Sequence, residues 1–258
     1  MILETSVVPR DSAEPCADRL VLGEHVLGVA DGATKKPWDT GPDGAELAEA
    51  VAGHLAATAA GCPAREAVDG ATALVRGLLG DAGVGSAVSF CVLHLGRREI
   101  WRVGEGRVLL DGLPVPPRPS GERIVAEARA LVLRRHLADD VPEATLRADD
   151  PGRAAVQELL RALVGLRNRP DPRYGYGALD GQDVPDLFVE VVPVPGGVRE
   201  VVITTDGYPE PAPTLAEAER LLAQRLARDP LMLDPPETKG KRPAANSFDD
   251  RAYLRVAL

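Results

Sequence analysis

The stretch "GVADGAT", residues 28–34, closes the apolar run "VLGVA" with an acid and a glycine, Asp31 and Gly32. The run predicts a short buried strand. A carboxylate at the end of such a strand is costly to desolvate unless it meets a metal ion, a cationic side chain or water. Further acids in similar places would therefore indicate a shared cation site.

Two more acidic positions lie where a predicted strand meets a loop. Asp206 follows the run "EVVITT" and is itself followed by Gly207, while Asp249 and Asp250 directly precede the final run "RAYLRVAL". Each feature alone is more commonly a turn or a solvated loop. Mg²⁺ and Mn²⁺ bind carboxylates, carbonyls and water, and glycine lets a backbone carbonyl approach an ion closely. Together the positions predict a carboxylate metal site.

The composition favours one globular domain over 1–258. Of the 258 residues, 45% are hydrophobic and 27% charged, which is enough apolar material for a core. Aromatic residues make up only 3%, so the core must consist mainly of Val, Leu, Ala and Ile. The formal net charge of -9 argues against nucleic acid as the main partner.

The cysteines and the apolar runs favour a cytoplasmic protein without a membrane segment. Cys16, Cys62 and Cys91 are odd in number and lack metal-ligand spacing, which predicts reduced thiols. No apolar run reaches the roughly 18 residues of a membrane span, and the first residues lack the basic start and apolar centre of a signal peptide.

The order of the elements is typical of an α+β protein. Two strands are expected in "RLVLGEHVLGVADG", and the runs "SAVSFCVLHL", "REIWRVGEG" and "RVLLDG" predict an antiparallel meander. Helices are expected at 45–60, 64–80, 122–138, 152–169 and 214–229, and further strands at 185–197, 199–207 and 251–258. Strand clusters separated by pairs of helices favour an α+β sandwich over a βαβ array.

The motif series along the chain resembles that of the metal-dependent Ser/Thr protein phosphatases of type 2C, the PPM-type family. The matching motifs are "ADR", "GVADG", "RVGEGRVLL", "VVITTDGY" and "FDDRAYLRV", in this order and over nearly the whole chain. The resemblance implies a four-layer α-β-β-α sandwich, with two central antiparallel sheets flanked by helices. It also implies two Mg²⁺ or Mn²⁺ ions at one end of the sandwich.

The resemblance assigns roles to individual residues. Asp31 would bridge both ions, and Gly32 would offer a backbone carbonyl. Asp206 and Asp249 would complete the ligands, with Asp18 as a supporting acid. A water shared by two ions has a lowered pKa and attacks a phosphoester without a covalent intermediate.

Two assignments stay open. The stretch "DDRAYL" aligns a residue either way, so Asp250 is an alternative ligand to Asp249. Arg10 lies roughly where the family has a phosphate-binding arginine, a task that suits a bidentate guanidinium, and an exposed surface arginine is the alternative.

The sequence departs from the family pattern in three motifs, as an atypical bacterial branch would. After Gly32 it continues with Ala, Thr, Lys35 and Lys36 instead of further glycine. The Glu-Asp-Arg element is reduced to "ADR", and the usual Gly-Asp-Ser-Arg turn is "GEGR", in which we interpret Glu105 as structural. The loop beside the metals is therefore expected to differ in shape.

Two stretches fall outside the family pattern. "RYGYGALDG", which includes Tyr174–Gly181, predicts an ordered loop that could border the metal site. "LMLDPPETKGKRPAANSFDD" is a long connection that includes the basic segment Lys239–Arg242. Long structured loops near a site often determine substrate choice, and a plain surface loop is the alternative.

Three functions are compatible with these observations. The first is a metal-dependent phosphatase acting on a phosphomonoester, with a phosphoserine or phosphothreonine protein as the expected partner. The second is a pseudophosphatase that serves as a binding or regulatory module, favoured by the altered loop after Gly32. The third is a phosphatase of a small phosphorylated metabolite, favoured by the two stretches outside the family pattern.

Overall fold

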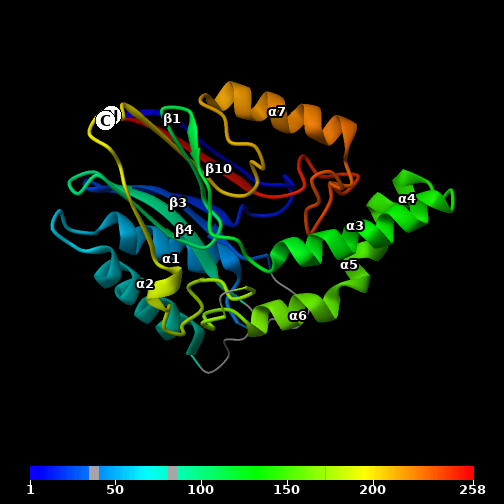
Figure 1. The fold of residues 1–258 in the computed structure, drawn as a ribbon, viewed down its shortest axis with the longest axis horizontal. Helices are drawn as coiled ribbons and strands as arrows, with labels where there is room; N and C mark the ends of the chain where they lie inside the picture. The colour runs from blue at the N-terminus through cyan, green and yellow to red at the C-terminus, as the bar shows by residue number, and fades with distance from the viewer. Residues whose placement is uncertain (35–40, 81–85, 172) are drawn as a thin grey trace.

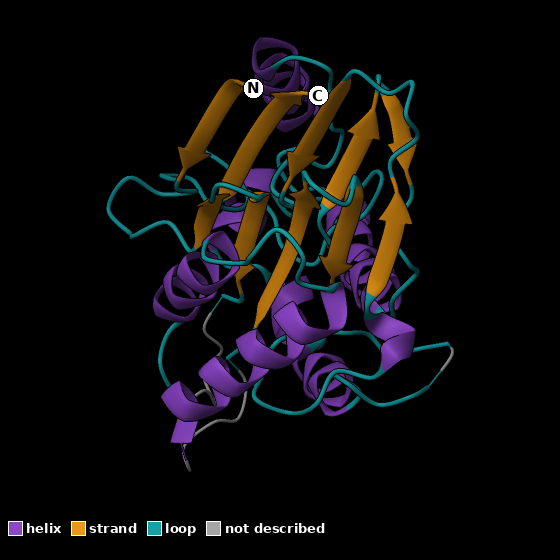
Figure 2. Ribbon diagram, turned by 90° about the vertical axis from the view of Figure 1, so that its left-hand side faces the viewer, coloured by secondary structure: helices purple, strands orange, loops and turns teal. Residues whose placement is uncertain are grey.

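Two five-stranded antiparallel sheets lie at the centre of the protein (Figures 1 and 2). The computed structural model describes residues 1–34, 41–80, 86–171 and 173–258. The first sheet has the order β1-β10-β9-β6-β7 and the second the order β2-β3-β4-β5-β8. The strands are β1 (Ile2–Val8), β2 (Asp18–Leu22), β3 (Val26–Gly32), β4 (Val88–His94), β5 (Glu99–Val103), β6 (Arg107–Leu110), β7 (Leu113–Val115), β8 (Glu190–Pro193), β9 (Glu200–Thr204) and β10 (Arg251–Ala257).

Helices cover the outer face of each sheet. The pair α1 (Gly44–Ala56) and α2 (Ala64–Leu79) packs on the second sheet, and α7 (Leu215–Arg228) packs on the first (Figure 1). The side chains of Asp43 and Thr214 cap the starts of α1 and α7 by accepting backbone hydrogen bonds. The predicted four-layer α-β-β-α sandwich is confirmed.

Each interface between layers has its own apolar core. Val29 and Cys91 of the second sheet meet Ile203 and Leu254 of the first in the layer between the sheets. Small and branched side chains dominate there, as the low aromatic content predicts. The buried Tyr253 belongs to the core beneath α7, where its ring meets that of a second tyrosine edge to face.

The predicted meander is wrong in its third strand. β4 and β5 pair as expected, but β6 leaves their sheet and pairs with β9 and β7 of the other sheet. The crossing uses two glycines. Gly104 has a positive φ of 94°, and a Cβ on Gly106 would lie 2.3 Å from the Cβ of Cys91. The chain can pass from one sheet to the other here because glycine has no Cβ that would collide with Cys91.

A helical arm extends from one end of the sandwich (Figure 1). It contains α3 (Glu122–Ala138), α4 (Glu143–Ala148), α5 (Pro151–Ala155) and α6 (Gln157–Gly165), and the short 3₁₀ helix Asp186–Phe188 follows later in the chain. The helix expected over 152–169 is therefore divided, and α4 and the edge strand β1 were not predicted. None of the described helices is long and apolar enough to cross a membrane.

Gly207 holds two strand ends close together and should not tolerate a side chain. A Cβ there would lie 1.9 Å from the carbonyl oxygen of Asp250, next to the start of β10. We expect Gly207→Ala to lower the free energy of unfolding by roughly 1–3 kcal/mol in urea titrations, because backbone must move to admit the methyl group. The matched control Gly53→Ala, in α1 with nothing within 4 Å, should raise it by up to about 1 kcal/mol. A stability of Gly207→Ala equal to wild type would contradict this account.

Candidate metal and phosphate site

The acids singled out in the sequence meet at one end of the two sheets. Asp18 begins β2 and lies opposite Asp31, near the end of β3. Asp206 follows β9, and Asp249 precedes β10, the antiparallel neighbour of β9. Both therefore lie at the same end of the strands of the first sheet. Asp31, Asp206 and Asp249 line one cavity of about 160 Å³. Segments far apart in the sequence therefore contribute carboxylates to one place.

The carboxylates differ in their partners. Asp18 is 2% exposed and accepts a hydrogen bond of 2.6 Å from the hydroxyl of Thr205, which links the two sheets. Asp249 accepts a bond of 2.9 Å from the amide of Asp250. Within the described part of the chain, the carboxylates of Asp31 and Asp206 accept no hydrogen bond and form no ion pair. Two carboxylates thus face the cavity without a protein partner there.

Burial and mutual repulsion raise the pKa of several of these acids. Desolvation, followed by the charges of Asp18, Asp206 and Asp249, raises the pKa of Asp31 well above its usual range. Desolvation and the charge of Asp249 raise the pKa of Asp206 to about 7. The same two causes, opposed by the Thr205 hydroxyl, raise the pKa of Asp18. The site holds more negative charge than its protein surroundings compensate, which is the electrostatic condition for binding a cation.

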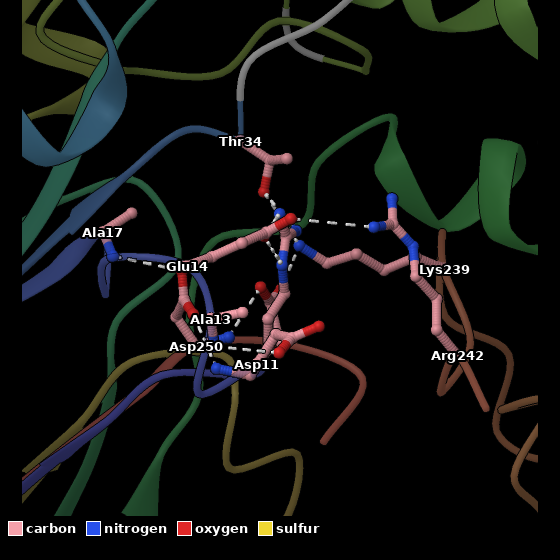
Figure 3. A network of polar contacts seen from close by, with 10 residues as sticks. Asp11, Ala13, Glu14, Ala17, Thr34, Lys239, Arg242 and Asp250 are labelled. Atoms are coloured by element: carbon pink, nitrogen blue, oxygen red, sulfur yellow. Dashed lines mark hydrogen bonds and ion pairs between the residues drawn. The ribbon is translucent and has the colours of Figure 1, made fainter. Parts of the chain in front are cut away.

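One cation of the protein already lies in this cluster. The ammonium nitrogen of Lys239 is 2.5 Å from Oδ2 of Asp249 and 3.2 Å from the hydroxyl of Thr34, beside which Figure 3 places it. Burial works against the charged form, but Asp249 and Asp206 outweigh burial and raise the pKa of Lys239. The ammonium group therefore stays charged and neutralises part of the cluster.

The donor set fits a divalent cation in charge and in ligand type. Asp31 and Asp206 offer unpartnered carboxylate oxygens, the ligands that Mg²⁺ and Mn²⁺ prefer. However, the described residues contain no group of three or more His, Cys, Asp or Glu side chains arranged to hold one ion. Lys239 contacts the third carboxylate, that of Asp249, so a metal ion and the ammonium would compete for it.

Asp250 and Arg10 have structural contacts. The Asp250 carboxylate accepts the amide hydrogens of Arg10 at 2.7 Å and Ala17 at 3.1 Å, and so fastens the segment after β1 (Figure 3). The Arg10 guanidinium pairs with Glu14 at 2.7 Å and reaches Thr34 at 3.3 Å. Of the two adjacent acids, Asp249 is the one that lines the cavity.

Gly32 is required by packing close to the site. A Cβ at this position would lie 2.0 Å from the carbonyl oxygen of Gly44, at the start of α1. The glycine thus lets α1 approach the strand end that carries Asp31. Lys35 and Lys36, which follow in the sequence, lie outside the described residues.

Glu105, which we interpreted as structural from the sequence, lines the same cavity. Burial, together with the charge and hydrogen bond of Glu122, raises the pKa of Glu105 well above its usual range, while the Ser120 hydroxyl, 3.1 Å away, works in the opposite direction. These surroundings favour the protonated form of this carboxyl. The glycines on both sides of Glu105 were the one signal in the sequence that its backbone has an unusual position.

Two further cations and the tyrosine loop complete the wall. Arg153 of α5 and Arg167 line the same cavity, and Arg167 donates a bond of 3.3 Å to the hydroxyl of Tyr176. Tyr176, Gly177 and Ala178 come from the stretch "RYGYGALDG", which therefore borders the carboxylates. Neither arginine was singled out from the sequence, because both follow from the placement of the helical arm.

Comparison with solved structures supports the fold assignment. MsPP of Mycobacterium smegmatis, a PPM Ser-Thr phosphatase crystallised with cacodylate, has 17% sequence identity and a TM-score of 0.52, with 99% of this chain and 97% of that chain covered. The serine/threonine phosphatase PstP/Ppp of Mycobacterium tuberculosis has 15% identity and a TM-score of 0.48, with 100% and 99% covered. The fold assignment rests on the first, and the resemblance to PPM-type phosphatases is confirmed for the fold. The sequence matches no protein-family model and no curated protein sequence.

The carboxyl cluster should make the stability of the metal-free protein depend on pH. The pKa of Asp206 is about 7 in the folded protein and about 4 for an unfolded Asp, so the folded state binds more protons between these values. The free energy of unfolding should therefore rise as the pH falls from about 8 to about 5.5. Urea titrations in EDTA measure this dependence, and a stability that falls over that range would contradict it.

A matched pair of variants assigns the pH effect to the site. Asp206→Asn removes the charge without changing the shape, so it should raise stability at about pH 8 and flatten the pH dependence. Asp140→Asn changes an exposed residue outside the cavity and should leave both unchanged.

Proposed function

We propose that residues 1–258 form one domain that hydrolyses phosphomonoesters with the help of divalent metal ions. The observation that carries this proposal is the pair of unpartnered carboxylates, Asp31 and Asp206, which face a cavity flanked by Arg153 and Arg167. Carboxylates bind the metal, and guanidinium groups bind phosphate. The PPM-type fold supports the same conclusion.

Different side chains would bind the metal ions and the substrate phosphate and would protonate the leaving group. Asp31, Asp206 and Asp249 would hold the metal, with the Gly32 carbonyl as a further ligand and Asp18 in support. When bound, Mg²⁺ or Mn²⁺, with two ions expected, supplies a water of lowered pKa as the nucleophile. The substrate phosphate would lie between these carboxylates and Arg153, while Arg167, which is paired with Asp180 at 3.7 Å, would support the cavity wall.

Glu105 is suited to protonate the leaving oxygen. It lines the same cavity as Asp31 and Asp206, and burial raises the pKa of its carboxyl and so favours the protonated form. A neutral carboxyl can donate that proton as the phosphoester bond breaks, which is general acid catalysis. Burial, reinforced by Glu122 beside it, raises the pKa of this carboxyl.

A binding module without catalysis is the second candidate. The contact of 2.5 Å between Lys239 and Asp249 favours it, because an ammonium group on this carboxylate opposes metal binding. In that case the fold would bind a phosphorylated partner and release it unchanged.

Hydrolysis of p-nitrophenyl phosphate distinguishes the two candidates. We expect turnover by the wild type with Mn²⁺ or Mg²⁺ and none in EDTA. Asp31→Asn should lose turnover by a factor of about 100 or more and should lose Mn²⁺ affinity in calorimetry, because it removes a ligand charge from the site. Asp140→Asn is the matched control and should resemble wild type. A folded wild type that binds no metal and has no turnover would contradict the proposal and favour the binding module.

A further inference from the structure

A second, strongly basic cavity adjoins the carboxylate cavity. It measures about 670 Å³ and lies between the helical arm and the long connection before β10. Seven arginine and lysine residues line it against three aspartates, although the whole chain has a net charge of -9. Thr34, Arg153 and Lys239 line both cavities, so the two are neighbours with a shared wall.

Three of the cations in this cavity lack a carboxylate partner among the described residues. Arg147 donates to the backbone carbonyl of Lys241 at 3.2 Å, and Arg153 donates to the carbonyl of Thr238 at 2.9 Å. Lys241 makes no side-chain hydrogen bond or ion pair within the described part. Half-buried cations that are not paired with a carboxylate attract anions from solution, because water compensates their charge only in part.

Further groups in the wall are consistent with a bound anion. The hydroxyl of Ser247 is 1% exposed and has no hydrogen-bond partner in the described structure, although the residue lines the cavity. Burial lowers the pKa of Arg153, while the charge of Glu122 works in the opposite direction. An anionic oxygen in the cavity would satisfy the hydroxyl and the cations together.

We propose that the substrate is a small phosphomonoester with a second anionic group, such as a second phosphate, which binds to Arg147 and Lys241, while Arg153 lies on the wall that the two cavities share. This inference rests on the proposed function, since the scissile phosphate is placed at the carboxylate cavity. The volume of the basic cavity suits a small molecule, because ligand pockets in proteins measure roughly 300–1,000 Å³. The shared wall lets one ligand span both cavities.

The test uses a bisphosphonate whose two phosphonates are joined by a butane chain, compared with butylphosphonate. The carbon-phosphorus bonds resist hydrolysis, so calorimetry in the presence of Mg²⁺ reports binding whether or not the protein has turnover. We expect the bisphosphonate to bind at least about tenfold more tightly than butylphosphonate. The double variant Arg147→Gln/Lys241→Gln should lose most of this preference, because charged hydrogen bonds are removed.

Controls keep the outcome interpretable. Arg199→Gln changes an exposed arginine outside the cavity and should keep the full preference, and Arg147→Lys, which retains the charge, should keep more of it than the double variant does. Equal binding of the two phosphonates by folded wild type would overturn the inference, as would an unchanged preference in the double variant. Tighter binding of an acidic phosphopeptide than of the bisphosphonate would also overturn it. A normal preference without hydrolysis of p-nitrophenyl phosphate would contradict the proposed function alone.

Discussion

Electrostatic repulsion among Asp18, Asp31, Asp206 and Asp249 is the constraint on which the rest of the site depends. The sandwich brings these acids from four strand ends to one end of the two sheets. The carboxylates of two of them have no hydrogen-bond or ion-pair partner in the described chain. Such a cluster destabilises the fold unless cations compensate it. Lys239 supplies one positive charge, and divalent metal ions would supply the remainder. The proposed metal binding and the cost in stability therefore have the same origin.

The helical arm and the connection before β10 add cationic side chains to the carboxylate site. They bring Arg153 and Lys239 to the wall between an acidic and a basic cavity. A phosphoester needs both environments, because its metal-binding side must meet carboxylates and its remaining negative charge must meet cations. Under the proposed function, the two sheets would provide the metal ligands, and the additions to the sandwich would define the space for the rest of the substrate.

The sequence allowed the strand ends and their acids to be predicted, because local apolar patterns locate strands and Asp-Gly pairs mark their ends. Asp31 and Asp206 lie where the patterns put them. Long-range features were missed. The switch of β6 between sheets depends on the close contact of Gly106 with Cys91, and edge strand β1 buries too little surface to have a clear pattern. The position of Lys239 depends on how a long connection folds back, which no local pattern encodes.

The competition between Lys239 and metal for Asp249 is tested most directly by Mn²⁺ titration of Lys239→Met in a calorimeter. Methionine keeps the length of the side chain and removes its charge. The account predicts Mn²⁺ affinity at least about tenfold higher than wild type, with Lys241→Met, which lies outside the carboxylate cavity, close to wild type. Unchanged or weaker affinity in Lys239→Met would contradict the claim that its ammonium group occupies a position where the metal binds.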